Sequence, residues 1–300
     1  MRIGIFGGDT AGRSITDVVA DARAAADDGF ASYALPQIFA LDAMGVLTVV
    51  GREVPRIALM TGVVPTYGRH PLTMAQQALT VQAASGGRFT LGIGLSHQLV
   101  IENMFGLSFD KPVRHMREYL SVLMPLLHEG HASFAGETIR TDATIGVEPR
   151  LACPVLVAAL GAQMLKLAGT MTEGTMTWMT GPSTLGSHTV PTITRAAADA
   201  GRPAPQVVAS LPVCVTEDID AARERAARDF QVYGFLPSYR AMLDREGAEG
   251  PADVAIAGDE AAVEKQVRAL ADAGVTEYVA SIFGSRDERA RTRSLLKSML

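Results

Sequence analysis

The sequence has few of the features that mark membrane, disulfide-rich or zinc proteins. Its 300 residues include two cysteines, Cys153 and Cys214, in separate apolar runs without metal-type spacing, so we expect buried thiols rather than a disulfide or a zinc site. No apolar run reaches the roughly eighteen residues of a membrane span. The first residues pass directly into a strand-like run. We therefore expect a soluble, cytoplasmic protein with no membrane contact.

Charge of one sign is not concentrated anywhere in the chain. There are 27 Lys and Arg residues against 32 Asp and Glu, a formal net charge of −5, and no basic cluster occurs. A nucleic acid or an anionic membrane surface is recognised by such a cluster. We expect a small-molecule substrate and no nucleic acid.

Familiar catalytic motifs are missing as well. The sequence has no GxSxG or HExxH motif, and its six histidines form no set with Asp and Glu at metal-ligand spacing. We therefore predict no metal site, and we expect a bound cofactor to supply the difficult chemistry.

Short β-type runs alternate with amphipathic runs along the chain. Eight strands are predicted: Arg2–Phe6, Ala31–Leu35, Ile57–Val63, Phe89–Gly94, Val155–Leu160, Thr175–Met179, Val207–Val215 and Tyr278–Phe283. Eight βα units with right-handed crossovers favour a (β/α)8 TIM barrel, an α/β fold, as one domain over residues 1–300. An open doubly wound sheet is the alternative, but the first turn, Phe6–Ser14, does not fit its G-x-G-x-x-G fingerprint.

Two stretches interrupt the alternation and predict insertions in the barrel. Gly130–Arg150 is rich in Gly and Thr and indicates an extended excursion, whereas Gly234–Gly258 contains a short helical segment. The helix of the seventh unit is expected at Ile219–Val232.

The residues that follow the strands build the active face of a βα barrel. A Gly-Val-Val-Pro end at Gly62–Pro65 should therefore lie near a Gly-Leu-Ser-His end at Gly94–His97. Glycine leaves room for a flat ring close to the backbone, and His97 offers a polar edge. Equally, the glycines can serve ordinary loop geometry and His97 can make a purely structural hydrogen bond.

Two later strand ends are further candidates. Leu160, Gly161 and Ala162 follow a buried strand and open a helix, where free N–H groups attract an anion such as phosphate. Any βα turn shares that description. Trp178, the only tryptophan, ends the sixth strand and either walls a pocket or packs in the core.

At these positions the chain resembles the luciferase-like monooxygenase superfamily, and within it the coenzyme F-420-dependent oxidoreductases of actinobacteria. The resemblance covers nearly the whole chain and rests on Leu35–Ala43, Thr61–Gln98, Arg114–Leu127, Pro154–Gly169, Gly174–Pro182 and Leu236–Gly247. It implies a barrel with insertions, often a homodimer, with a deazaflavin ring lying across the strand ends. It also implies a cis peptide bond between Gly62 and Val63.

The same resemblance assigns the cofactor-binding residues. The Gly62–Val63 bulge would support the ring from behind, the Gly94–His97 end would border it, and the Gly161 turn and the Gly174–Trp178 strand would approach its phosphate-bearing tail. Sugar-phosphate dehydrogenases of the superfamily have a histidine after the second strand, where this chain has Gln37, whose amide cannot exchange a proton near neutral pH. The expected set is Gln37, Gly62, Val63, Gly94, Ser96, His97, Leu160, Gly161, Ala162, Gly174 and Trp178.

The resulting hypothesis is an oxidoreductase in which reduced F-420 delivers hydride to an activated C=C, C=N or C=O bond of a small organic substrate. His97 is the first candidate for donating a hydrogen bond or proton to the substrate, and Tyr67 is the second. Two alternatives stay open: an FMN-dependent monooxygenase on the same barrel, and a flavin-binding barrel without turnover.

Overall fold

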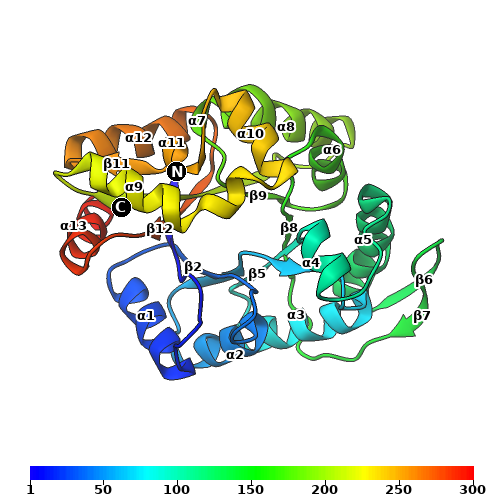
Figure 1. The fold of residues 1–300 in the computed structure, drawn as a ribbon. Coiled ribbons are helices and arrows are strands. Elements are labelled where there is room, and N and C mark those ends of the chain that lie inside the picture. The colour runs from blue at the N-terminus through cyan, green and yellow to red at the C-terminus, as the bar shows by residue number, and fades with distance from the viewer.

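The computed structural model describes residues 1–300, which form a closed barrel of parallel strands surrounded by helices (Figure 1). Neighbours around the barrel pair in parallel, and the last strand pairs with the first. In order they are β1 (Arg2–Phe6), β2 (Ser32–Leu35), β3 (Ala58–Thr61), β5 (Phe89–Gly94), β8 (Val155–Val157), β9 (Gly174–Trp178), β10 (Gln206–Val215) and β12 (Glu277–Ile282). The predicted (β/α)8 TIM barrel is confirmed.

Side chains fill the inside of the barrel, so it is a core and not a pore. Six strands each contribute one buried apolar residue to this interior: Ala34, Met60, Leu156, Met176, Val208 and Val279. Phe6 and Val63, at the ends of β1 and β3, pack against the group and are only partly buried. The interior is therefore filled up to the level at which these strands end.

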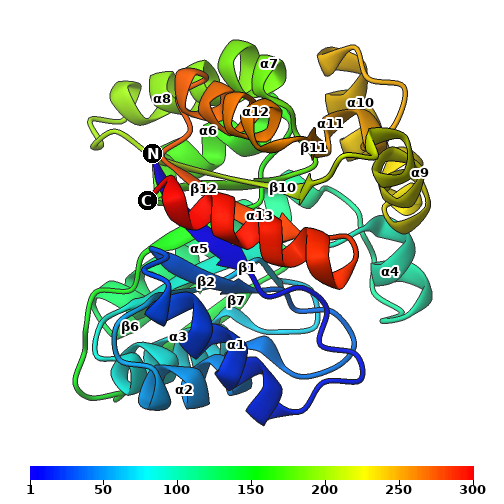
Figure 2. The same ribbon diagram turned by 90° about the vertical axis from the view of Figure 1, so that its left-hand side faces the viewer.

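Helices cover the outside of the barrel (Figure 2). They are α1 (Ile15–Asp27), α2 (Ala43–Glu53), α3 (Pro71–Ser85), α5 (Pro112–His128), α6 (Ala162–Met171), α8 (Val190–Asp199), α12 (Glu260–Asp272) and α13 (Arg286–Ser298). Ser14 and Ser285 begin α1 and α13 with capping boxes, in which the serine and the third helical residue satisfy each other's backbone N–H groups. None of the helices combines the length and the apolar character that crossing a membrane requires.

The seventh unit departs from the sequence prediction. The helix expected at Ile219–Val232 ends earlier, as α9 (Ile219–Asp229), and the helices that pack on β10 are α12 and α13. Between α9 and α12 lie a 3-10 turn at Gln231–Gly234, α10 (Pro237–Glu246), α11 (Pro251–Val254) and β11 (Ile256–Gly258), which pairs with β10. The physical reason is burial: α9 buries only two alanines, whereas α12 buries Val263, Val267 and Leu270 along one face.

Other connections are short elements at the barrel ends. Strand β4 (Val64–Pro65) extends the pairing beside β5, and α4 (Gln98–Asn103) follows β5. Helix α7 (Pro182–Thr184) and a π-helical turn at Leu185–Thr189 lead into α8. The excursion expected at Gly130–Arg150 is an antiparallel hairpin, β6 (His131–Ala135) and β7 (Arg140–Thr144), which projects from the body in Figure 1.

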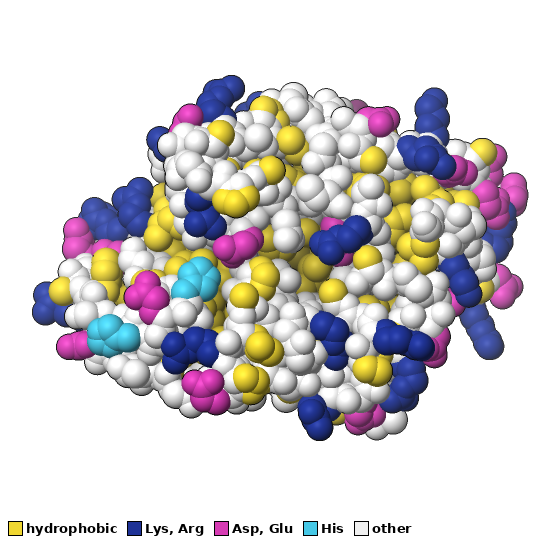
Figure 3. All heavy atoms as spheres, turned by 180° about the vertical axis from the view of Figure 1, so that it is seen from behind, with side chains coloured by type: hydrophobic (Ala, Val, Ile, Leu, Met, Phe, Trp, Pro, Cys, Tyr) yellow, Lys and Arg dark blue, Asp and Glu magenta, His cyan; other side chains and the backbone are white.

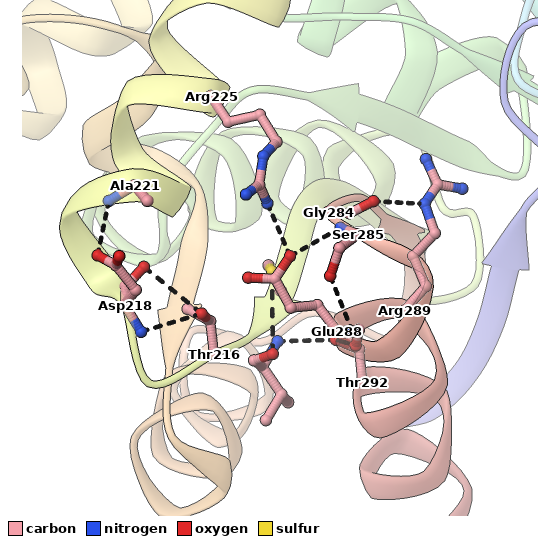
Figure 4. A network of polar contacts seen from close by, with 11 residues as sticks. Thr216, Asp218, Ala221, Arg225, Gly284, Ser285, Glu288, Arg289 and Thr292 are labelled. Atoms are coloured by element: carbon pink, nitrogen blue, oxygen red, sulfur yellow. Dashed lines mark hydrogen bonds and ion pairs between the residues drawn. The ribbon is translucent and has the colours of Figure 1, made fainter.

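The ends of β10 and β12 are tied together by polar contacts (Figure 4). Glu288 on α13 accepts a hydrogen bond from the Ser285 N–H at 2.7 Å and pairs with Arg225 on α9 at 2.9 Å. Burial opposes ionisation of Glu288, but these hydrogen bonds and the Arg225 charge outweigh it and lower its pKa to about 2. We call this group, with Thr292 Oγ1 accepting from the Val215 N–H, the charged clasp.

Candidate active site

Two glycines, at the ends of β3 and β5, are closely packed against neighbouring side chains. A Cβ atom on Gly62 would lie 2.9 Å from Phe6 Cε2 and from Met176 Cε, and one on Gly94 would lie 2.9 Å from Val63 Cγ2. The Gly62–Val63 peptide bond is cis, which confirms the sequence prediction. The two glycine ends predicted to be neighbours are therefore packed against each other through Val63.

The backbone after β5 presents His97. Ser96 has φ 60°, a left-handed conformation that is uncommon for a residue other than glycine and is frequent at functional sites. His97 then begins α4, and its side chain makes no capping hydrogen bond. Burial lowers the pKa of His97, so the imidazole is neutral at pH 7 and can donate from one nitrogen and accept at the other.

A series of contacting aromatic rings connects Phe6, at the end of β1, to His97, after β5. Phe6 stacks on Trp178, with centroids 5.6 Å apart, and Trp178 meets Tyr233 edge-on at 5.8 Å. Tyr233 contacts Tyr239 at 5.0 Å, and Tyr239 lies 5.8 Å from His97. We call these five residues the aromatic arc.

The polar atoms of the aromatic arc are neutral. Burial raises the pKa of Tyr233 and of Tyr239, so both remain phenols at any physiological pH. The indole Nε1 of Trp178, which can only donate, is buried and has no hydrogen-bond partner. The arc therefore carries no charge near neutral pH.

The start of α6 offers a different kind of contact. Gly161 precedes the helix without a side-chain cap, is exposed, and a Cβ added there would meet nothing within 4 Å. The N–H groups of Ala162 and Gln163 at this ten-residue helix are thus free to bind an anion. The carbonyl oxygen of Leu160 accepts a hydrogen bond from His188 Nε2 at 2.9 Å.

Two of the expected cofactor-binding residues have other surroundings. Gln37 Oε1 accepts from the Ala43 N–H at 2.8 Å and helps to begin α2, so its side-chain amide is already engaged. Gly174 is a correction: it begins β9, at the opposite end of that strand from Trp178, and a Cβ there would collide with the Gln206 carbonyl oxygen. The close approach of the β10 backbone, and not a ligand, therefore requires glycine at this position.

Tyr67 belongs to a separate stack. Its ring lies flat on His115, with centroids 4.0 Å apart, and near Phe109 at 5.4 Å. Its hydroxyl is buried without a partner, and burial, helped by the Asp110 carboxylate, raises the Tyr67 pKa to about 12. No ring contact joins this stack to the aromatic arc, although the segments that carry Tyr67 and His97 pair directly, with the Thr66 N–H donating to the Gly94 carbonyl oxygen at 2.8 Å.

Two features of the site were missed from the sequence. Tyr233 and Tyr239 lie in the insertion after α9, and only its folding back over the strand ends brings them to Trp178 and His97. His188 lies in the π-helical turn, and no motif marks it. When a single aromatic residue lies in a long connection, the sequence does not indicate whether its side chain contacts a ligand or packs in the core.

Charge is absent along the strand ends that carry these residues. No Asp, Glu, Lys or Arg occurs in Thr61–Gly68, Gly94–Ile101, Ala158–Leu165 or Trp178–Thr194. No group of three or more His, Cys, Asp and Glu residues is arranged to hold a metal ion. On the face turned away from the viewer of Figure 1, basic and acidic side chains are interspersed (Figure 3).

The chain is similar to several known proteins. A family model described as luciferase-like monooxygenase matches residues 1–290. The 5,10-methylenetetrahydromethanopterin reductase of Methanolobus tindarius is 28% identical over 260 residues, which cover 85% of this chain and 78% of that protein. The F-420-dependent glucose-6-phosphate dehydrogenase of Nakamurella multipartita is 29% identical over 228 residues, 73% of this chain and 65% of that protein.

A solved structure shares the fold over the full length. An F-420-dependent secondary alcohol dehydrogenase in complex with an F-420–acetone adduct superposes with a TM-score of 0.81 and 20% identity, covering 100% of this chain and 98% of that one.

Proposed function

Because the chain belongs to the luciferase-like monooxygenase family, we propose that it is an oxidoreductase that uses reduced coenzyme F-420 to reduce an activated C=C, C=N or C=O bond of a small organic substrate. The observation that carries the proposal is the pair of glycine-lined, uncharged strand ends beside the uncapped start of α6. This pairing suits a ligand with a flat ring and a phosphate-bearing tail.

The residues present fit the deazaflavin. Gly62, Val63 and Gly94 present uncharged backbone and one valine side chain at the ends of β3 and β5. Ser96 and His97 lie at the edge of that surface. Leu160, Gly161 and Ala162 would bind the phosphodiester through backbone N–H groups at the start of α6. The dehydrogenase relative supports F-420 rather than FMN.

The chain's own residues would then position and polarise the substrate. Reduced F-420, when bound, supplies a hydride from C5 of its ring. His97, whose imidazole is neutral because burial lowers its pKa, donates a hydrogen bond to the substrate atom that gains electron density. Gln37 stays committed to the start of α2 and takes no part in proton transfer. Tyr67 is the weaker candidate, since a phenol with a pKa of about 12 gives up its proton poorly.

The test of this proposal is parallel binding of F-420 and FMN at matched ionic strength. The purified chain is titrated with each while the fluorescence of Trp178, its only tryptophan, is followed. We expect tighter binding of F-420, followed by hydride transfer from reduced F-420 in a spectrophotometric assay. Tighter binding of FMN, or oxygen-dependent turnover with reduced FMN, would overturn the F-420 assignment in favour of a monooxygenase. Binding without turnover of any acceptor would favour a non-catalytic barrel.

Three broader points belong to the same proposal. Residues 1–300 act as one barrel domain, the protein is a homodimer, and it works in the cytoplasm. Sedimentation analysis of the purified chain measures the second point directly, and a monomer at micromolar concentration would exclude the dimer.

A further inference from the structure

The hairpin of β6 and β7 presents an open strand edge. It projects from the body of the molecule (Figure 1), and β6 lies against α5, whereas β7 pairs only with β6. A two-stranded hairpin is marginally stable by itself, and an open edge is a template for pairing with another chain. The outer side of β7 is therefore a candidate interaction surface.

The backbone groups of alternate β7 residues point away from β6. At one end of the hairpin the Gly136 N–H donates to the Ile139 carbonyl oxygen at 2.8 Å, and β6 and β7 pair from there onward. At the other end the Ile145 N–H donates to the Gly130 carbonyl oxygen at 2.8 Å. Hydrogen-bonded and non-hydrogen-bonded pairs alternate between these two points. The outward-facing residues, whose N–H and C=O groups we call the β7 edge, are Arg140, Asp142 and Thr144.

The turn of the hairpin is fixed to the body of the protein. The carboxylate of Glu118, on α5, accepts hydrogen bonds at 2.8 to 3.1 Å from three N–H groups of the turn, those of Glu137, Thr138 and Ile139. Arg114, also on α5, pairs with the Glu137 carboxylate. A strand that is held in place beforehand loses less conformational entropy when it binds a partner. The β7 edge is thus already in an extended, fixed conformation.

The side chains of the β7 edge carry opposite charges two residues apart. Arg140 and Asp142 are both exposed and point to the same face of the strand. The Arg140 guanidinium has no partner, and the nearest cationic group to Asp142, Nε2 of His131, lies 4.0 Å away. Charges of one sign along an edge would oppose pairing. Opposite charges at this spacing make the edge complementary to a second copy of itself.

One antiparallel register of two β7 edges suits these charges. With Thr141 of both copies at a two-fold axis, Arg140 of each copy lies opposite Asp142 of the other, with Cα atoms about 5.5 Å apart in hydrogen-bonded pairs. Moving the axis by one residue sets Arg140 opposite Arg140, or Asp142 opposite Asp142. The charges therefore select the register with its axis at Thr141.

We propose that two copies of this chain associate through their β7 edges, forming a continuous four-stranded antiparallel sheet in which Arg140 and Asp142 pair across a two-fold axis at Thr141. The inference rests on the homodimer of the proposed function and assigns the surface through which it forms. Main-chain hydrogen bonds between the edges supply the attraction, and the charges fix the register.

Charge reversal tests the surface and the register together. Sedimentation equilibrium measures the dimer dissociation constant of the wild type, Arg140→Asp and Asp142→Arg. Each single reversal sets like charges opposite one another, so it should raise the constant at least about tenfold. An equimolar mixture of the two variants should associate within about threefold of the wild type, because each position then faces the opposite charge again. The control Arg195→Asp, at an exposed arginine on α8, should leave the constant unchanged.

A disulfide cross-link locates the axis. Thr141→Cys places two thiols in a non-hydrogen-bonded pair with Cα atoms about 4.5 Å apart, within the range that a disulfide spans, so mild oxidation should give a covalent dimer. The control Ala143→Cys faces Ile139 of the other copy, which leaves its two thiols about 13 Å apart and uncross-linked. The native thiols of Cys153 and Cys214 are buried. Equal cross-linking of the two variants would overturn the register.

The outcomes separate this inference from the function on which it rests. A chain that is monomeric at micromolar concentration contradicts both the homodimer and the β7 edge. A dimer whose dissociation constant is the same in the wild type and in both reversal variants leaves the homodimer standing and overturns the β7 edge. F-420 binding is measured by its own titration, so the coenzyme assignment is tested independently of either result.

Discussion

At the ends of β10 and β12, charged side chains hold the strands to α9 and α13, whereas the ends of β3, β5, β8 and β9 carry no charged residue at all. In the charged clasp, Glu288 Oε2 accepts from the Ser285 N–H and from Arg225, and Gly284 lies packed against Cys214 and Glu288. On the other side, the Trp178 N–H and the start of α6 are unpartnered. One part of the active face is satisfied internally, and the other leaves its donors for a ligand.

Within this one barrel, the residues that stabilise the fold therefore differ from the residues that we expect to bind a ligand. Polar groups that satisfy one another stabilise the fold, while unpartnered donors cost stability and acquire partners only when a ligand binds. Substitutions in the charged clasp should therefore change the free energy of unfolding and leave binding intact, and substitutions at the uncharged ends should do the reverse.

The largest effect is expected from His97→Ala at the uncharged side. If the imidazole acts on the substrate in the transition state, kcat should fall by about 10²–10⁴-fold, while the F-420 dissociation constant and the Tm change little. Steady-state kinetics with a titration of F-420 measures both, and His97→Gln should restore part of the rate by keeping a hydrogen-bond donor. Unchanged turnover in the alanine variant would leave His97 a structural residue.

A smaller effect, on stability, is expected from Glu288→Gln in the charged clasp. Because the folded-state pKa of Glu288 is lowered from 4.5 to about 2, its ionised form stabilises the fold fully above pH 4.5, and this contribution is lost as the pH falls through about 2. The variant should lose about 1–3 kcal/mol near pH 7 and show a flatter stability profile between pH 4.5 and 2.

Urea denaturation at a series of pH values measures this profile. Glu224→Gln is the matched control, since Glu224 lies exposed on α9 one residue before Arg225. F-420 binding should be the same in the wild type and both variants. A Glu288→Gln variant as stable as the control at pH 7 would contradict the role given to the charged clasp.

The smallest effect is expected from Gly161→Val at the start of α6. A Cβ there meets nothing within 4 Å, so the Tm should stay within about 2 °C, but the valine side chain would keep a phosphate away from the helix N–H groups. F-420 affinity should fall about tenfold, or about 1.4 kcal/mol. Gly146→Val, which also meets nothing within 4 Å, is the control. Unchanged F-420 affinity of the Gly161→Val variant would show that the coenzyme tail does not bind at the start of α6.

The sequence predicted the elements well where a local pattern is strong. The sequence marks both ends of the helix Pro71–Ser85, because Pro occupies its first position and Gly86 follows its last residue. The third strand was expected to continue to Val63 but ends at Thr61, where the cis peptide interrupts the pairing. Helix α12 was not predicted, because the preceding insertion disturbs the alternation by which helices were assigned.

The sequence by itself determined the number and order of the eight barrel strands, because apolar period and turn residues act over a few neighbours at a time. It also indicated which glycines and which histidine follow the strands. Only the tertiary structure decided that Phe6, Trp178, Tyr233 and His97 form one arc, while Tyr67 joins His115 and Gly174 lies at the far end of the barrel. Such contacts join residues far apart in the chain, so they depend on how the insertion after α9 packs over the closed barrel, which no local pattern encodes.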